Sequence, residues 1–219
     1  MISKTLVQKN IPTLDLQQTC AEVSDIFNIY HLPVLPVIHK YELLGMISSS
    51  IISGFSPDTP LQELSSLLLR GHGYEEEHIF DIMGKMSQFQ LPVIPVLDAN
   101  QHYSGCITSE KLIYFMAESY SLQENGHIIM IEAGAKDYSM SEICRIFESE
   151  GIQVIGSFIS QNINTSGVTI TIKTNTQETL RVRNTLERYG YRLIVTYQED
   201  LYQSTLKERY NSLMHYLNV

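Results

Sequence analysis

An internal repeat limits this sequence of 219 residues to a small set of folds. The run Leu-Pro-Val-Leu-Pro-Val-Ile at 32–38 returns as Leu-Pro-Val-Ile-Pro-Val-Leu at 91–97. Gly-Met-Ile-Ser at 45–48 then returns as Gly-Cys-Ile-Thr at 105–108, in the same order and with one additional residue between the runs. Such self-similarity indicates two copies of one supersecondary unit, which bury an apolar surface against each other.

Each copy is predicted to contain a helix, two strands joined by a turn, and a second helix. In copy one, Thr19 and Glu22 have the spacing of a capping box, before an apolar stripe at Val23, Ile26, Phe27 and Tyr30. In copy two, the acidic run 75–77 is placed at the positive end of a helix with the stripe Ile79, Ile82, Met83, Met86 and Phe89. A connecting helix is predicted to begin with Thr59 as its cap and Pro60 in its first turn, and to stop at Gly71.

These motifs resemble a tandem pair of cystathionine-beta-synthase (CBS) domains, also called a Bateman module. The resemblance rests on the Leu-Pro-Val and Gly-x-Ile-Ser/Thr runs of both copies and covers residues 1–119. It implies an α+β fold of two β-α-β-β-α repeats. Repeat 1 then occupies residues 1–58, and repeat 2 with its leading helix occupies residues 59–120.

From residue 127 the pattern changes to strand, helix, strand, strand, helix, strand. Strands are expected at 128–133, 152–160, 168–172 and 192–197, with helices capped by Ser139 (with Glu142) and by Thr174 (with Gln177). This order is the ferredoxin-like βαββαβ arrangement, and residues 126–198 resemble an ACT domain. The domain combination is similar to that of bacterial acetoin-utilisation accessory proteins.

Two further segments complete the predicted organisation. Residues 120–126 read as a polar linker between the domains. Residues 199–219 are predicted to form an amphipathic helix whose apolar face is buried either on its own domain or in an oligomer contact. That face consists of Tyr202, Leu206, Tyr210, Leu213 and Leu217.

The CBS resemblance implies a site for an adenosine derivative in the cleft between the two copies. It assigns ligand contacts to Leu32, Pro33, Val34 and Ser48 in copy one, and to Leu91, Pro92, Val93, Thr108 and Lys111 in copy two. The aspartate that family members use for the ribose is replaced by Ile51 and Lys111. Lys111 could instead face a phosphate as a point charge. The alternative is that Ser48 and Thr108 serve only as helix caps.

Charge and cysteine content restrict the partners. The chain has 15 basic and 24 acidic residues, a net charge of −9, so we expect no nucleic-acid partner and no membrane surface. No apolar stretch is long enough to span a bilayer. Three scattered cysteines and a start without a signal core favour the cytoplasm. The run from His72 to His78 contains ligand types for zinc, but an acidic run at a helix start has its own electrostatic reason, and we expect no metal.

No catalytic motif is present: the sequence has neither a Gly-x-Ser-x-Gly elbow nor a phosphate-binding loop. We therefore expect a non-catalytic regulatory protein that senses a ligand, with an adenosine-containing nucleotide as the candidate, and that modulates a separate partner protein. The alternative is a dimeric scaffold with degenerated pockets, and an enzyme ranks third. Both resemblances imply a homodimer, formed through the CBS pair, the ACT-like domain or both.

Overall fold

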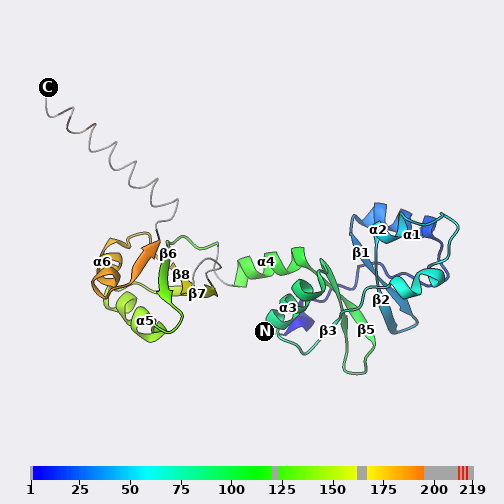
Figure 1. Cartoon of the computed structure of the whole chain (residues 1–219), viewed down its shortest axis with the longest axis horizontal. Coiled ribbons are helices and arrows are strands. Elements are labelled where there is room, and N and C mark those ends of the chain that lie inside the picture. Colours follow the sequence, from blue (N-terminus) through cyan, green and yellow to red (C-terminus); the bar gives the residue numbers. More distant parts are fainter. Residues whose placement is uncertain are drawn as a thin grey trace. The chain divides into compact units, whose positions relative to one another are not determined.

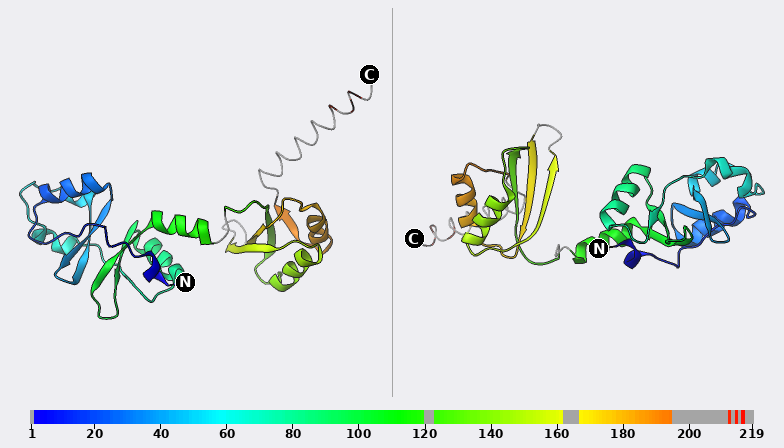
Figure 2. Two further views of the ribbon diagram at one scale, coloured as in Figure 1. Left: turned by 180° about the vertical axis from the view of Figure 1, so that it is seen from behind. Right: turned by 90° about the horizontal axis from the view of Figure 1, so that it is seen from below.

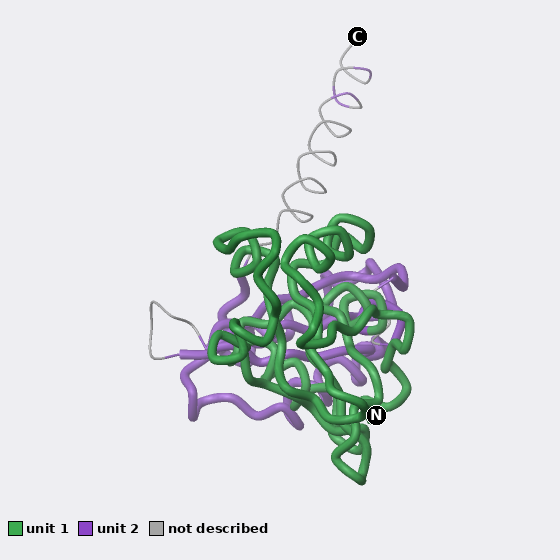
Figure 3. Tube along the Cα trace, turned by 90° about the vertical axis from the view of Figure 1, so that its right-hand side faces the viewer, with its two compact units in different colours: residues 1–115 green, residues 116–219 purple. Residues whose placement is uncertain are grey.

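The computed structural model describes residues 2–119, 123–161 and 167–194, together with 212, 214 and 216. The chain divides into two compact units, Met1–Phe115 and Met116–Val219 (Figure 3). The five residues of the predicted apolar face at 199–219, and part of the predicted linker, lie outside the described residues.

The first repeat of unit 1 follows the predicted order. It contains α1 (Cys20–Tyr30), β1 (Val34–His39), β2 (Glu42–Ser48) and the short α2 (Ser49–Ile52), and β1 and β2 form an antiparallel hairpin (Figure 1). The capping box of α1 is confirmed. The Thr19 hydroxyl accepts from the Glu22 amide, and the Glu22 carboxylate accepts from the Thr19 amide at 2.9 Å.

The second repeat contains β3 (Gly73–Tyr74), α3 (Ile79–Phe89), β4 (Val93–Leu97), β5 (Tyr103–Thr108) and α4 (Ser109–Ser119). The acidic run 75–77, predicted at the positive end of a helix, lies just before α3 and outside its first turn, because the helix begins at Ile79 and His78 caps it. The carboxylates have long-range cationic partners instead. Glu75 pairs with Lys4 at 2.8 Å, and Glu77 pairs with Lys85.

The two repeats exchange their outermost paired segments. Gln8, which precedes the first repeat, pairs antiparallel with Cys106 of β5, and Leu69, which precedes β3, pairs antiparallel with Met46 of β2. On the other side of each hairpin, Leu14 bridges Val37 in parallel, just as β3 pairs with β4. Each repeat is therefore completed at one edge by a segment that leads into the other.

The exchange explains the glycine of each Gly-x-Ile motif. A Cβ on Gly105 would lie 2.6 Å from the carbonyl oxygen of Gln8, and a Cβ on Gly45 would lie 2.8 Å from the Cβ of Leu68. Both residues also have a positive φ, +150° and +156°. The crossing segment can approach the hairpin this closely only because no side chain stands between them.

The connecting helix differs from its prediction. Residues Leu61–Leu67 form a 3-10 helix that follows Pro60, and Thr59 provides no side-chain cap. Thr59 instead lies beside an isolated β-bridge. Its carbonyl accepts from the Cys20 amide, and the neighbouring Pro60 pairs with Thr19. The helix ends before Leu69 because that residue must be extended to pair with Met46. A similar 3-10 turn, Ser3–Leu6, precedes Gln8.

Unit 2 has the predicted ferredoxin-like order. Its elements are β6 (Ile128–Gly134), α5 (Met140–Ser149), β7 (Val154–Gln161), β8 (Gly167–Thr174), α6 (Leu180–Arg188) and β9 (Arg192–Ile194). The described strands form an antiparallel sheet in the order β7-β8-β6-β9, and α5 and α6 cover one face of it (Figure 2). Positions 195–197, predicted as the end of the last strand, lie outside the described residues.

Two capping predictions in unit 2 need correction. Ser139 accepts from the Glu142 amide as expected, but the Glu142 carboxylate accepts from the Tyr191 hydroxyl at 2.8 Å. Thr174 does not cap α6: it is the buried last residue of β8, and its hydroxyl donates to the carbonyl of Thr176 at 2.8 Å. Thr179 precedes the helix instead, without a side-chain cap.

Each unit has its own apolar core. In unit 1 one core joins the two repeats, since Leu91, Val93 and Cys106 of the second pack with β1 and β2 of the first. In unit 2 the core lies between the sheet and the two helices, and includes Ile131, Ile170, Phe147 and Leu186. The two CBS-like repeats therefore form one folding unit, whereas unit 2 has a separate core.

Candidate functional site

Thr108 lies where β5 ends and α4 begins. Its hydroxyl accepts from the Lys111 amide at 3.1 Å and donates to Gln8 Oε1 at 3.0 Å. The residue is 8% exposed, so this hydroxyl is a satisfied cap at the helix start. Lys111 itself is exposed in the first turn of α4.

Ser48 occupies the same place in the first repeat. Its hydroxyl accepts from the Ile51 amide at 3.3 Å and lies 2.9 Å from the Ser50 hydroxyl. The helix that it caps has only four residues, and Ile51 packs against the core of the unit. The first repeat thus offers neither a charge nor a long helix at the position equivalent to Lys111.

The Leu-Pro-Val run of each repeat lies beside the helix start of that repeat. Val34 is paired with Ser48 and Val93 with Thr108. The carbonyl oxygens of Pro33 and Pro92 accept from the amides of Ser49 and Ser109, at 3.0 and 2.9 Å. Val34, Leu91 and Val93 are buried, whereas Leu32 and Pro92 are half-buried and Pro33 is exposed. The structure therefore brings together the predicted residues within each repeat.

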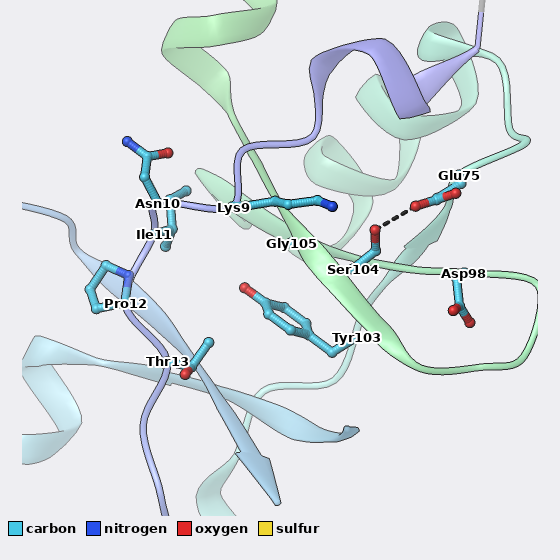
Figure 4. Close-up of a pocket in the computed structure, with 10 residues that line it drawn as sticks. All are labelled: Lys9, Asn10, Ile11, Pro12, Thr13, Glu75, Asp98, Tyr103, Ser104 and Gly105. Atoms are coloured by element: carbon cyan, nitrogen blue, oxygen red, sulfur yellow. Dashed lines mark hydrogen bonds between the residues drawn. The ribbon is translucent and has the colours of Figure 1, made fainter. Parts of the chain in front are cut away.

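A pocket of about 600 Å³ lies elsewhere in unit 1, and none of the predicted site residues lines it. Its walls are the crossing segment Lys9–Thr13 and the start of β5, Tyr103–Gly105, with Glu75 and Asp98 at one side (Figure 4). Figure 4 shows the Tyr103 ring at the centre, with the Lys9 side chain reaching across towards Ser104 and Glu75. Ser104 Oγ donates to the Glu75 carboxylate.

Four ionisable groups at or beside this pocket have shifted pKa values. The ammonium group of Lys4 and the hydroxyl of Ser104 lower the pKa of Glu75, and the backbone amides of His102 and Asn100 lower that of Asp98. Burial raises the pKa of Tyr103, and it raises the pKa of the neighbouring Cys106 thiol to about 12. The phenol and the thiol, whose Oη and Sγ are 3.3 Å apart, are therefore both neutral at pH 7 and supply neither a nucleophile nor a general base.

The histidines of the acidic run do not converge on a shared point. His72 Nε2 lies 3.1 Å from the Tyr74 hydroxyl, while His78 Nδ1 accepts from the Phe80 amide. Among the residues that the structure describes, no three His, Cys, Asp or Glu side chains are arranged to hold a metal ion.

No protein-family profile and no curated protein matches the chain. Solved structures of CBS domain pairs do match it. A CBS domain pair/ACT domain protein from Thermotoga maritima matches with a TM-score of 0.50 and 18% identity, over 54% of this chain and 98% of that one. Unit 1 has the fold of a CBS domain pair. The identity is low enough that the likeness establishes the fold alone.

Two other similar structures are CBS pairs. The CBS domains of a transcriptional regulator from Streptococcus pneumoniae match with a TM-score of 0.48 and 17% identity, over 52% of this chain and 98% of that one. A CBS pair solved with 5′-methylthioadenosine and S-adenosyl-L-methionine matches with a TM-score of 0.46 and 21% identity, over 54% of this chain and 97% of that one.

The residues around the first pocket of the CBS pair were missed in the sequence. Lys9, Tyr103 and Ser104 match no motif, and Glu75 was assigned to a helix start. Only the structure relates the segments that cross between the repeats, since Gln8 pairs with Cys106 as Leu69 pairs with Met46. No helix of the described part of the chain is long and apolar enough to cross a bilayer.

Proposed function

We propose that this chain is a non-catalytic regulatory protein whose CBS pair binds an adenosine-containing nucleotide. The proposed contacts are Leu91, Pro92, Val93, Thr108 and Lys111 in the second repeat, with Leu32, Pro33, Val34 and Ser48 as the counterparts in the first. The observation that carries the proposal is the exposed Lys111 in the first turn of the 11-residue α4. A cationic side chain at the positive end of a helix provides charge for a phosphate.

The two repeats are unequal in this respect, and we propose the second as the nucleotide-binding half. In the first repeat, the position of Lys111 is held by Ile51, which packs on the core. An anionic ligand at Ser48 would therefore meet no compensating charge from this position. One nucleotide per chain is the expected stoichiometry.

Titration calorimetry of the full chain with AMP, ADP, ATP and S-adenosylmethionine tests this proposal. We expect Lys111→Ala to weaken binding of the tightest of AMP, ADP and ATP about five- to tenfold, because one charge contact with phosphate is lost. Lys136→Ala, an exposed lysine in the loop before α5, is the matched control and should bind as the wild type does. Absence of binding to all four ligands would contradict the nucleotide assignment.

Regulation would follow if the ligand bound two conformations of the protein with different affinities. A ligand at the start of α4 can shift such an equilibrium only as far as its affinities for the two conformations differ. A partner protein that binds one conformation would then be captured from lysate with a ligand-dependent yield. Equal capture by wild-type and Lys111→Ala protein, with and without nucleotide, would argue against this coupling.

A second candidate function is a dimeric scaffold without a small-molecule ligand. It is favoured by Thr108, whose hydroxyl already bonds Gln8 and the Lys111 amide and so is not free for a ribose. A homodimer is part of both readings. The edge strand β7 is the candidate contact in unit 2, since Phe158 and Ile159 are 42% and 47% exposed there.

Light scattering coupled to size exclusion tests the dimer. We expect a mass of about twice the 25.0 kDa of one chain at micromolar concentration. Ile159→Lys should shift the protein towards monomer, whereas Arg145→Glu, on the exposed part of α5, should not. A wild-type protein that elutes only as monomer would exclude the dimer from both readings.

A further inference from the structure

A second pocket of unit 1 lies at the turns of its two β-hairpins. It has a volume of about 680 Å³ and is lined by the β1–β2 hairpin end, by the β4–β5 hairpin end and by His72, which directly precedes β3. Both turns lie at the same edge of the unit, the lower one in Figure 1. The Tyr103 amide donates to the Tyr41 carbonyl at 2.8 Å and so ties one hairpin to the other.

Basic and titratable side chains are concentrated in this pocket. His39, His72 and His102 line it together with Lys40, although residues 1–120 contain only five histidines and six lysines or arginines. Lys4 and Lys85 are paired with carboxylates, but Lys40 forms no ion pair with another described residue. In a chain with a net charge of −9, this pocket is a local concentration of side chains that carry or can accept a positive charge.

The opposing charges at the pocket are few. Glu42 is the carboxylate of the lining, and Asp98 lies behind His102, with 4.0 Å between its Oδ2 and His102 Nδ1. The Asp98 carboxylate already accepts from the amides of Asn100 and His102, which hold it in the turn. Tyr41 supplies an exposed ring, 5.8 Å from the ring of His102. With the three imidazoles protonated, cationic groups outnumber the carboxylates.

We propose that the pocket between the hairpin turns is an oxyanion site, built from Lys40, His39, His72 and His102, that takes the phosphate group of a small molecule. A protonated imidazole carries a positive charge and donates from both ring nitrogens, so each of the three histidines can supply charge and a donor to a phosphate oxygen. Binding of a dianion stabilises the protonated rings and therefore takes up protons. This site is separate from the one proposed at Lys111.

Sulfate is the suitable probe, because it stays doubly charged while a phosphate group changes charge at about pH 6. Imidazole NMR resonances of the full chain would be followed during titration with sulfate. We expect the signals of His39, His72 and His102 to move together, with binding about tenfold tighter at about pH 6 than at about pH 8. Lys40→Gln and His39→Gln should each weaken sulfate binding several-fold; Lys40 is exposed in the turn, and His39 is exposed at the end of β1.

His31→Asn is the matched control: it removes an exposed histidine at the end of α1, where the left-handed backbone also suits asparagine. It should bind sulfate as the wild type does. Sulfate shifts that are spread equally over His31 and His127, or an affinity that does not change with pH, would overturn the proposal.

The two sites are distinguished by the same variants. Lys111→Ala should leave sulfate binding at the histidines unchanged, and His39→Gln should leave the nucleotide affinity at Lys111 unchanged. Pyrophosphate that shifts the three histidines, as sulfate does, would support a phosphate-bearing ligand. Failure of pyrophosphate to compete with sulfate there would contradict it.

Discussion

Gly45 and Gly105 have the same task in the two repeats, since each lets a crossing segment lie against a hairpin. At Gly105 the obstacle to a side chain is the Gln8 carbonyl, a backbone atom that cannot rotate away. At Gly45 the nearest atom is the Cβ of Leu68, which is likewise fixed to the backbone. The motif that reveals the repeat in the sequence therefore marks the points of exchange.

Gly105→Ala should lower the free energy of unfolding by about 2–3 kcal/mol, because the new methyl group meets the Gln8 carbonyl and the positive φ becomes strained. Urea denaturation measures this loss. Gly84→Ala is the control: a Cβ there meets no atom within 4 Å, and alanine in α3 should stabilise by about 0.5–1 kcal/mol. Equal stability of the two variants would contradict the close approach at Gly105.

The Cys106 thiol makes stability depend on alkaline pH. Its pKa rises from 9.0 in the unfolded chain to about 12 in the fold, chiefly through burial. Because the folded value is the higher one, the stabilisation is complete below about pH 9 and is lost as the pH rises towards 12. Urea midpoints of the wild type should fall between about pH 8 and pH 10, and Cys106→Ala should show a smaller fall. An identical fall in both proteins would contradict this assignment.

Residue-level predictions succeeded where the partner is local. Thr19 and Glu22 are three positions apart, so their capping box could be identified from spacing alone. Glu75 and Glu142 failed for the opposite reason. Their actual partners are fixed by tertiary structure: Glu75 bonds Lys4 and Ser104, and Glu142 bonds Tyr191. A sequence pattern contains no information on such distant partners unless the topology is already known.

At the scale of elements, the exchanged segments decide how the two hairpins are completed. The Gln8 amide donates to the Cys106 carbonyl at 2.7 Å, and the Gln8 carbonyl accepts from the Cys106 amide at 3.0 Å. The Leu69 amide and carbonyl bond Met46 in the same way, at 2.7 and 2.9 Å. Without these bonds, β5 and β2 would each be left as an open edge. The predicted repeat boundary at residue 58 separates the motifs, but the paired segments run across it.

Gln8→Pro should destabilise unit 1 by about 1–3 kcal/mol, because proline has no amide to donate to Cys106. Gln8→Ala keeps both backbone bonds and loses only the side-chain bond to Thr108, so its cost should be about 1 kcal/mol or less. Hydrogen exchange of residues 103–108 should accelerate in the proline variant alone. Unchanged exchange in that variant would show that Gln8 does not hold β5.

The elements of both units could be predicted because their apolar periodicity is strong. The hairpins, α1 and the ferredoxin-like order follow from it, whereas the connecting helix of residues 59–71 does not. Leu61 and Leu64 are buried at helical spacing, but Leu69 has to be extended for its pairing with Met46. A tertiary requirement thus ended a helix that local propensity would have continued.

At the scale of the whole molecule, the separate cores predict two independently folding parts. Among the described residues, the buried apolar side chains of unit 1 lie between Leu6 and Leu112, and those of unit 2 between Ile129 and Tyr191. We expect fragments 1–119 and 123–219 each to unfold cooperatively and to reproduce the dispersed amide spectrum of the corresponding part of the full chain. Loss of dispersion in either fragment would show that its core depends on the other unit.

The candidate sites could be predicted less completely than the fold. The residues assigned by resemblance do meet within each repeat, because Leu-Pro-Val and Gly-x-Ile-Ser/Thr are on paired strands. The two pockets were not foreseen, since their walls come from turns and crossing segments that have no recurring motif. A pocket lined by loops depends on how strands are connected, which composition and periodicity do not specify.

The crossing of Gln8 onto β5 also determines how tension would travel through the CBS pair. A protein that grips residues 2–7 and pulls would load the second repeat, although the first repeat follows them in the chain. The load would reach β5 through the Gln8 backbone and the start of α4 through the Gln8–Thr108 bond. A partner that binds the N-terminal segment could thereby displace the start of α4, and with it Lys111, without contacting that site.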